Sequence, residues 1–199
     1  MSAVQIQMGR RAGYPRAPDR RTRLARRAGL VKASAGLTAP VPSMDDLAIV
    51  EVHAPAQLEQ AFAIRLRVFV AEQGVPERLE IDGRDETARH LLALHGDRPV
   101  GTLRVRLLEG GRVAKIERVA VLPETRGAGV GLALMRAVLA LARSAGTEVA
   151  RLHAQTRAER FYARLGFVAE GPEFEEDGIP HVAMRLSFPD DQVAAIIRP

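Results

Sequence analysis

The chain has 199 residues, 47% of them apolar, which is enough for one domain with a hydrophobic core. It has no Cys, which excludes disulfides, thiolate metal sites and a cysteine nucleophile and suits a reducing cytoplasm. No apolar run approaches the roughly 18 residues of a membrane-spanning helix, so no membrane partner is expected.

The net positive charge of the chain comes from its N-terminal part. Residues 1–43 carry nine basic residues and one acid, whereas residues 44–199 carry 20 basic and 23 acidic residues. The basic character of the chain therefore gives no reason to expect a specific nucleic-acid partner of the folded part.

We expect residues 1–43 to be a disordered Arg-rich tail, because they lack periodic apolar positions and are rich in Arg, Gly, Pro and Ala. Three interpretations stay open: a translation start assigned too early, with Met44 the true one, a solvated appendage with weak affinity for polyanions, or a targeting arm. A single folded domain is expected over 44–189, with a short C-terminal tail at 190–199.

The elements are expected in the order β-α-β-β-β-α-β-α-β-β. Strand patterns occupy residues 47–53, 88–95, 99–109, 111–123, 148–155, 167–176 and 179–188. Helix patterns begin at Pro55 and cover 129–144 and 156–165, and an irregular acidic loop is expected at 74–87. Strands outnumber helices and no repeat is present. The fold class is therefore α/β (α+β), with a mixed sheet and helices on its faces, in one domain.

A glycine-rich segment, RGAGVG at residues 126–131, stands at the start of the longest apolar helix. Glycines before a helix N-terminus allow several unpaired N–H groups to converge on one anion, and Arg126 adds a positive charge. The segment favours phosphate or pyrophosphate, although glycines needed only for turning are the structural alternative. A P-loop is excluded because Lys does not follow Gly131, and a dinucleotide fingerprint fits only at Gly127 and Gly129.

The flanking sequence adds a resemblance. IERVAVLPETRGAGVGLALM, followed by FYARLGF, resembles the GNAT family of N-acetyltransferases, and RVFVAEQGVPERLEIDGRDETARHLLAL with EFEEDGIPHVAMRL looks like its ElaA-like subgroup. The resemblance covers residues 47–188 and implies acetyl-CoA as co-substrate. It also implies a GNAT-type fold, which is a mixed, mostly antiparallel twisted sheet with helices on both faces. It implies a pyrophosphate site on Arg126, Gly127, Ala128, Gly129, Val130 and Gly131. It also implies a pantetheine site on the backbone of Val119, Ala120 and Val121, whose side chains can pack in the core at the same time.

The resemblance implies that Tyr162 reaches the cofactor sulfur, where a phenol of pKa near 10 can protonate a departing thiolate. A buried Tyr with a structural hydrogen bond is the alternative. The family does not fix the general base. Glu117, on the strand of the pantetheine site, and Glu72, at the end of the first helix, are the candidates. For each, the alternative is a solvated surface position or an ion pair with Arg, and water could carry the proton instead.

Other acids and histidines are weaker candidates. The loop acids Glu80, Asp82 and Asp85 could attract a cationic amine, or they could be solvated or form ion pairs with Arg. Glu176, Asp177 and His181 flank the last hairpin. His181 is a candidate because imidazole is the usual acid–base group of enzymes near neutral pH, but a hydrogen-bonded structural role suits it as well. The five His residues do not stand at metal-binding spacings, so no metal is predicted.

Together these features predict a cytoplasmic N-acetyltransferase that transfers an acetyl group from acetyl-CoA to a primary amine by direct attack. The acceptor would be a small-molecule or peptide amine. One alternative is a non-catalytic acyl-CoA sensor. Another is an acyl-homoserine-lactone synthase, because RLRVFV in this chain resembles the opening segment of that family. It is less favoured because the chain has no Trp. The strand PHVAMRLSF, taken as an edge strand, could pair across a homodimer axis.

Overall fold

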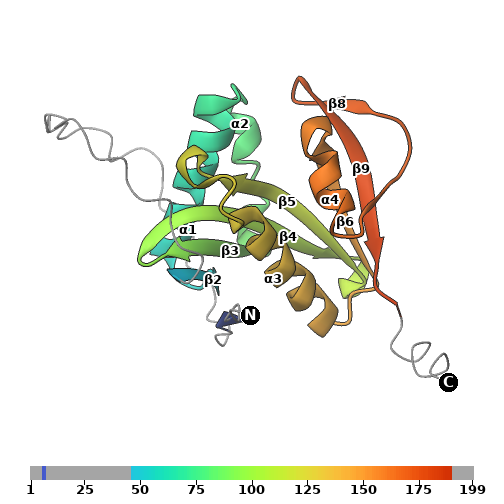
Figure 1. Cartoon of the computed structure of the whole chain (residues 1–199), viewed down its shortest axis with the longest axis horizontal. Coiled ribbons are helices and arrows are strands. Elements are labelled where there is room, and N and C mark those ends of the chain that lie inside the picture. Colours follow the sequence, from blue (N-terminus) through green and yellow to red (C-terminus); the bar gives the residue numbers. More distant parts are fainter. Residues whose placement is uncertain (1–5, 8–45, 190–199) are drawn as a thin grey trace, which may run out of the picture.

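The computed structural model describes residues 6–7 and 46–189 (Figure 1). Its strands are β1 (Ile6–Gln7), β2 (Leu47–Glu51), β3 (Arg89–His95), β4 (Arg98–Leu108), β5 (Val113–Val121), β6 (Val149–Gln155), β7 (Val168–Ala169), β8 (Phe174–Glu176) and β9 (Ile179–Ser187). Its α-helices are α1 (Pro55–Arg65), α2 (Glu77–Glu80), α3 (Val130–Ser144) and α4 (Glu159–Ala163). No helix in this part of the chain is long and apolar enough to cross a membrane.

All the strands belong to one sheet, in the order β1-β2-β3-β4-β5-β6-β9-β7, with β8 also paired to β9. The β1–β2 and β5–β6 pairs are parallel, and the other described pairs are antiparallel. The expected mixed, mostly antiparallel sheet is therefore confirmed.

Helices cover both faces of this sheet, as expected, because successive strand residues point to opposite faces. On one face, α3 buries Leu134, Met135 and Val138 against the strands. On the other face, α1 packs Ala61 and Ile64 in a smaller cluster. In Figure 1, α3 and α4 lie in front of the sheet and α1 lies behind it.

Several elements differ in detail from the sequence expectation. The first helix continues beyond α1 as a π-helical segment, η2 (Leu66–Glu72), and the expected loop 74–87 contains the short helix α2. The strand expected at 167–176 is divided into β7 and β8. Gly171, with a φ of 81°, and Pro172 lie between them, and both interrupt a strand.

β9 was expected to be an edge strand, and this expectation was wrong. β9 lies between β6 on one side and β7 and β8 on the other, so its backbone is covered along both edges. Within the tail expected to be disordered, the structure describes Ile6–Gln7 alone, as the strand beside β2. The other expectations for 1–43 and 190–199 lie outside the described residues.

Candidate active site

A cavity of about 1010 Å³ opens where two parallel strands separate. β5 and β6 pair only from Val113 to Lys115, opposite Val149 to Arg151, and diverge beyond this point. Residues 116–121 of β5 line one wall, while β6 and α4 contribute to the other. The backbone groups on the free side of β5 therefore face the cavity with no strand to pair with.

A bulge in β5 marks the middle of this wall. The register with β4 shifts between the pair Arg104–Glu117 and the pair Thr102–Ala120. Arg118 has a φ of 55°, in the left-handed region that costs a non-glycine residue energy. The bulge turns the peptide groups of Arg118 and Val119 out of the regular ladder, so an N–H of this segment can be directed at a ligand.

The glycine-rich segment forms the mouth of the same cavity. Gly127 and Gly129 have φ values of 82° and 81°, a conformation that glycine adopts without strain. Gly129 caps α3, and no side chain hydrogen-bonds to the helix start. The amides of the first helical turn, beginning at Val130, are therefore without intrahelical acceptors and are available to an anion.

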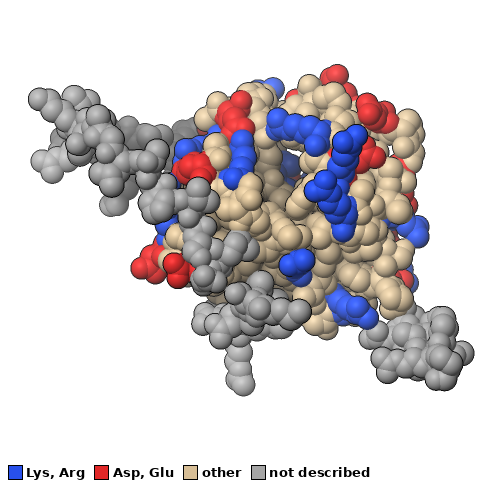
Figure 2. All heavy atoms as spheres, viewed as in Figure 1, with Lys and Arg blue, Asp and Glu red and all other residues tan. Residues whose placement is uncertain are grey.

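Cationic side chains surround this mouth. Figure 2 shows Lys and Arg side chains gathered around a hollow beside α4, and the cavity lining includes Arg126, Arg157 and Arg164. Arg157 and Arg164 were not predicted. They lie directly before and after α4, the helix of Tyr162, so their place on the cavity wall follows from the fold, and no sequence motif marks them.

Arg126 is already bound to one of the proposed bases. Its guanidinium donates two hydrogen bonds of 2.8 and 2.7 Å to the carboxylate of Glu72, and its Nε donates to the carbonyl oxygen of Val121 at 3.1 Å. The bond from Arg126 holds the pKa of Glu72 below its ordinary value despite some desolvation. Glu72 is exposed and is not among the residues that line the cavity.

Tyr162 lies on the wall formed by α4. It is 8% exposed and packs edge-on against Phe161 and Phe167. Burial raises the pKa of its phenol to about 12. Among the described residues, no group hydrogen-bonds its hydroxyl, although Tyr162 lines the cavity, so the phenol can serve as a donor to a ligand there.

Glu117 lines the cavity but is held by two arginines. Arg106 forms a two-pronged pair with it at 2.8 and 2.9 Å, and Arg104 approaches at 3.1 Å. Burial alone would raise the pKa of Glu117, but the bond from Arg106 and the charge of Arg104 outweigh it and lower the pKa. The ion-pair alternative left open by the sequence therefore describes its surroundings, and the carboxylate is ionised.

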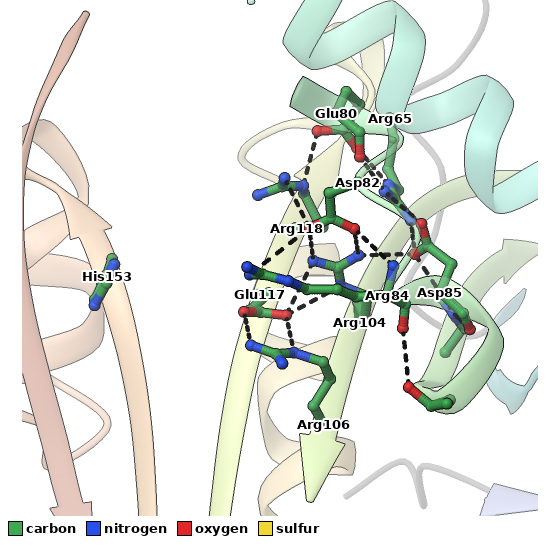
Figure 3. Close-up of polar contacts among 12 residues, drawn as sticks. Arg65, Glu80, Asp82, Arg84, Asp85, Arg104, Arg106, Glu117, Arg118 and His153 are labelled. Atoms are coloured by element: carbon green, nitrogen blue, oxygen red, sulfur yellow. Dashed lines mark hydrogen bonds and ion pairs between the residues drawn. The ribbon is translucent and has the colours of Figure 1, made fainter. Parts of the chain in front are cut away.

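Three acids of the loop 74–87, Glu80, Asp82 and Asp85, are turned inward onto arginines of the sheet and of α1 (Figure 3). Arg65, fully buried, bonds to Glu80 and, at 2.6 Å, to Asp85. Arg104, also fully buried, bonds to Asp82 at 2.7 and 2.8 Å. These carboxylates thus have cationic partners and are not available to attract a cationic amine.

The far wall of the cavity carries the residues of the last hairpin. His153 on β6 bonds to Glu176 at 2.9 Å, which lowers the pKa of that carboxyl, and it stands across from the arginine cluster in Figure 3. His181 donates from Nδ1 to the carbonyl oxygen of Ile179 at 2.8 Å. Asp177 lies in the hairpin turn, with a φ of 54°, and does not line the cavity.

Comparison with known proteins shows which family the chain belongs to. The acetyltransferase (GNAT) domain family matches residues 49–188. The chain belongs to the GNAT family of acetyltransferases. As a GNAT protein it is an acyltransferase, and the splayed strands and the glycine-rich helix start lie within the matched residues.

The similarity to several GNAT proteins extends over nearly the whole length of those proteins. YjcF of Bacillus subtilis, named an uncharacterized N-acetyltransferase, is 41% identical over 129 residues, which are 64% of this chain and 91% of YjcF. The crystal structure of Escherichia coli ElaA is 31% identical with a TM-score of 0.63, covering 70% of this chain and 98% of ElaA. An acyl-CoA N-acyltransferase from Pseudomonas aeruginosa has the same identity, TM-score and coverage. The expected ElaA-like neighbours are thus confirmed.

Proposed function

We propose that this GNAT protein transfers the acetyl group of acetyl-CoA directly to a primary amine. One observation carries the proposal. The free amides at the start of α3, the unpaired edge of β5 and the hydroxyl of Tyr162 all border one cavity. A diphosphate at the helix start and a pantetheine arm along β5 would bring a thioester to the point where β5 and β6 diverge.

In this proposal the cofactor site is formed by residues 126–131 together with the backbone of Val119, Ala120 and Val121. Arg126 and the amides after Gly129 would neutralise the diphosphate. The pantetheine amides would pair with β5 as an added strand does. An acyl-CoA N-acyltransferase among the relatives, 31% identical, supports this choice of co-substrate.

The reaction needs no covalent enzyme intermediate. The lone pair of the neutral amine attacks the thioester carbonyl carbon, forming the C–N bond, and an N–H of the β5 bulge stabilises the oxyanion. The ammonium proton passes to Glu117 directly or through water. The C–S bond then breaks, and Tyr162 gives its proton to the thiolate, so that the products are the N-acetylated amine and free CoA. Glu72, which is bound to Arg126, is the weaker candidate for the base.

The acid role of Tyr162 is tested by Tyr162→Phe. The change keeps the buried ring and removes only the hydroxyl, so we expect kcat to fall by about 10²-fold or more while the melting temperature stays close to that of the wild type. Release of free thiol from acetyl-CoA with a panel of amines measures the rate. An unchanged kcat would show that another donor protonates the thiolate.

The proposed diphosphate site at residues 126–131 is tested by Gly129→Glu. A carboxylate at this position repels the diphosphate, and its Cβ is strained at a φ of 81°. We expect calorimetry to show loss of CoA binding by the full chain, whereas Tyr162→Phe retains it. Intact binding by Gly129→Glu would place the diphosphate elsewhere. Binding by the wild type without turnover on any amine would favour an acyl-CoA sensor instead.

A further inference from the structure

A row of four cations crosses the sheet at the base of the cavity. The residues lie directly opposite one another on β4, β5, β6 and β9, and they are Arg106, Lys115, Arg151 and Arg185. Directly opposed residues share a face of the sheet, and like charges in such positions destabilise it. Ala114 and Ile116, the neighbours of Lys115, are buried in the core under α3, so the row faces the opposite side.

Three members of this row have carboxylate partners. Arg106 is bonded to Glu117, while Arg151 and Arg185 lie 3.8 and 3.6 Å from Glu170. Lys115 is different. It is half-buried and lines the cavity, yet none of the described carboxylates is within ion-pair or hydrogen-bond distance of its ammonium. An anionic group of a ligand can therefore form the ion pair that this ammonium lacks.

The carboxylates near this end of the cavity are already engaged. Glu117 is held by arginines and Glu176 by His153. The loop acids Glu80, Asp82 and Asp85 are bonded to the buried Arg65 and Arg104. A second ammonium entering here would find a like charge at Lys115. A carboxylate would find an ammonium with three donors free.

We propose that the acceptor amine carries a carboxylate, as an amino acid or a short peptide does, and that Lys115 binds this carboxylate. The inference rests on the proposed function and names the acceptor class for the same cavity. A single ammonium matches the single charge of a carboxylate. A phosphate dianion would leave part of its charge unmet, and phosphate sites more often use the planar fork of Arg.

The electrostatic surroundings of Lys115 agree with this role. Burial lowers the pKa of its ammonium. Glu117 and Glu176 oppose this from β5 and β8, while Arg106 on β4 and Arg151 on β6 add to it. A carboxylate bound at the ammonium would raise the pKa again, because an opposite charge favours the protonated form.

The first test compares matched acceptors on the full chain. Glycine and phenylalanine are assayed beside their amides, with spermidine and phosphoethanolamine as cationic and phosphate-bearing amines. Lys115→Met should reduce the preference for acid over amide by about 10- to 100-fold, mainly through the KM of the acid. Taking the ratio of wild type to variant cancels the different amine basicities of acid and amide. Lys115→Arg should retain most of the preference.

Arg151→Met is the matched control. It removes one positive charge from the neighbouring position of the same row, but Arg151 is not among the residues lining the cavity. We expect its acid-to-amide ratio to equal that of the wild type. An equal loss in both variants would indicate a general field effect and would overturn a specific role for Lys115, as would an unchanged ratio in Lys115→Met.

The second test does not depend on turnover. Lys32 and Lys115 are the only lysines of the chain, so ¹³C-labelled lysine gives two sets of side-chain NMR signals, and Lys115→Arg assigns them. We expect N-acetylglycine to shift the Lys115 signals and raise the apparent pKa, and N-acetylglycinamide to do neither. Equal responses, or none, would overturn the inference. Failure of every amine to release thiol would instead count against the proposed function.

Discussion

At the scale of single residues, the two carboxylates proposed as bases differ in their surroundings. Glu117 is on the cavity wall, and its ionised form is held by Arg104 and Arg106. Glu72 is exposed and forms its bonds with Arg126. A base must reach the proton it removes, so the position of Glu117 matters more than its weak basicity.

We therefore expect Glu117→Gln to lower kcat/KM by about 10²-fold, and Glu72→Gln to leave kcat nearly unchanged. The pKa of Glu117 is held below its ordinary value by the bond from Arg106 and the charge of Arg104, so the carboxylate is ionised throughout the neutral and alkaline range. In that range the pH profile should rise with deprotonation of the acceptor amine in both wild type and Glu72→Gln. If Glu117→Gln keeps the wild-type rate and melting temperature, water is the proton carrier.

At the scale of elements, the position of α3, the helix at the proposed cofactor site, is fixed by its close approach to the sheet. A Cβ at Gly101 on β4 would lie 2.9 Å from Cγ1 of Val130 and 3.2 Å from the carbonyl oxygen of Ala120. Val130 is the N-terminal residue of α3, and Ala120 lies on β5 at the proposed pantetheine site. Gly101 thus sets the spacing between the two parts of the proposed cofactor site.

Gly101→Ala should lower the free energy of unfolding by about 1–3 kcal/mol, because the packed strand on one side cannot yield. Displacement of the start of α3 should also raise the KM for acetyl-CoA. Gly131→Ala is the control for stability, since its Cβ would meet its neighbours at an ordinary 3.7 Å. Denaturant titration compares the two, and equal stability of Gly101→Ala and wild type would show that the helix has room to move.

Sequence patterns recovered the elements well and the ion pairs poorly. Alternation and helical spacing predicted β3, β4, β5 and α3, because these depend on local burial. The RGAGVG segment predicted a helix start open to anions, and such a start is present. The partners of Glu117 and Asp85 come from residues more than ten positions away, on other strands and on α1, and a loop of acids looks solvated until the arginines facing it are known. The row through Lys115 likewise depends on strand register.

At the scale of the whole molecule, the buried ion pairs predict acid lability. The pKa values of Asp82, Asp85 and Glu117 are lowered, because bonds and charges from arginines outweigh desolvation. A lowered carboxyl pKa stabilises the fold above the unfolded value, and this stabilisation is lost as the pH falls through the folded value. Glu80, whose pKa burial raises, acts in the opposite sense but is one group against three.

The melting temperature should therefore change little between about pH 8 and pH 6 and fall steeply below about pH 4. Calorimetry at constant ionic strength measures it. Added salt should have a small effect, because screening acts weakly on buried pairs. A melting temperature that is constant or rising down to pH 3 would contradict the linkage.

The bond between Glu72 and Arg126 joins two segments that are 54 positions apart in the chain. A diphosphate bound at the start of α3 would compete with Glu72 for the guanidinium of Arg126. Loss of the Glu72–Arg126 bond would release the end of η2. That helical segment also presents Phe69 to the cavity, followed by Gln73. Binding of acetyl-CoA would thus loosen the cavity wall that Phe69 and Gln73 form, before the acceptor amine enters. The two substrates would then bind in a compulsory order, with acetyl-CoA first.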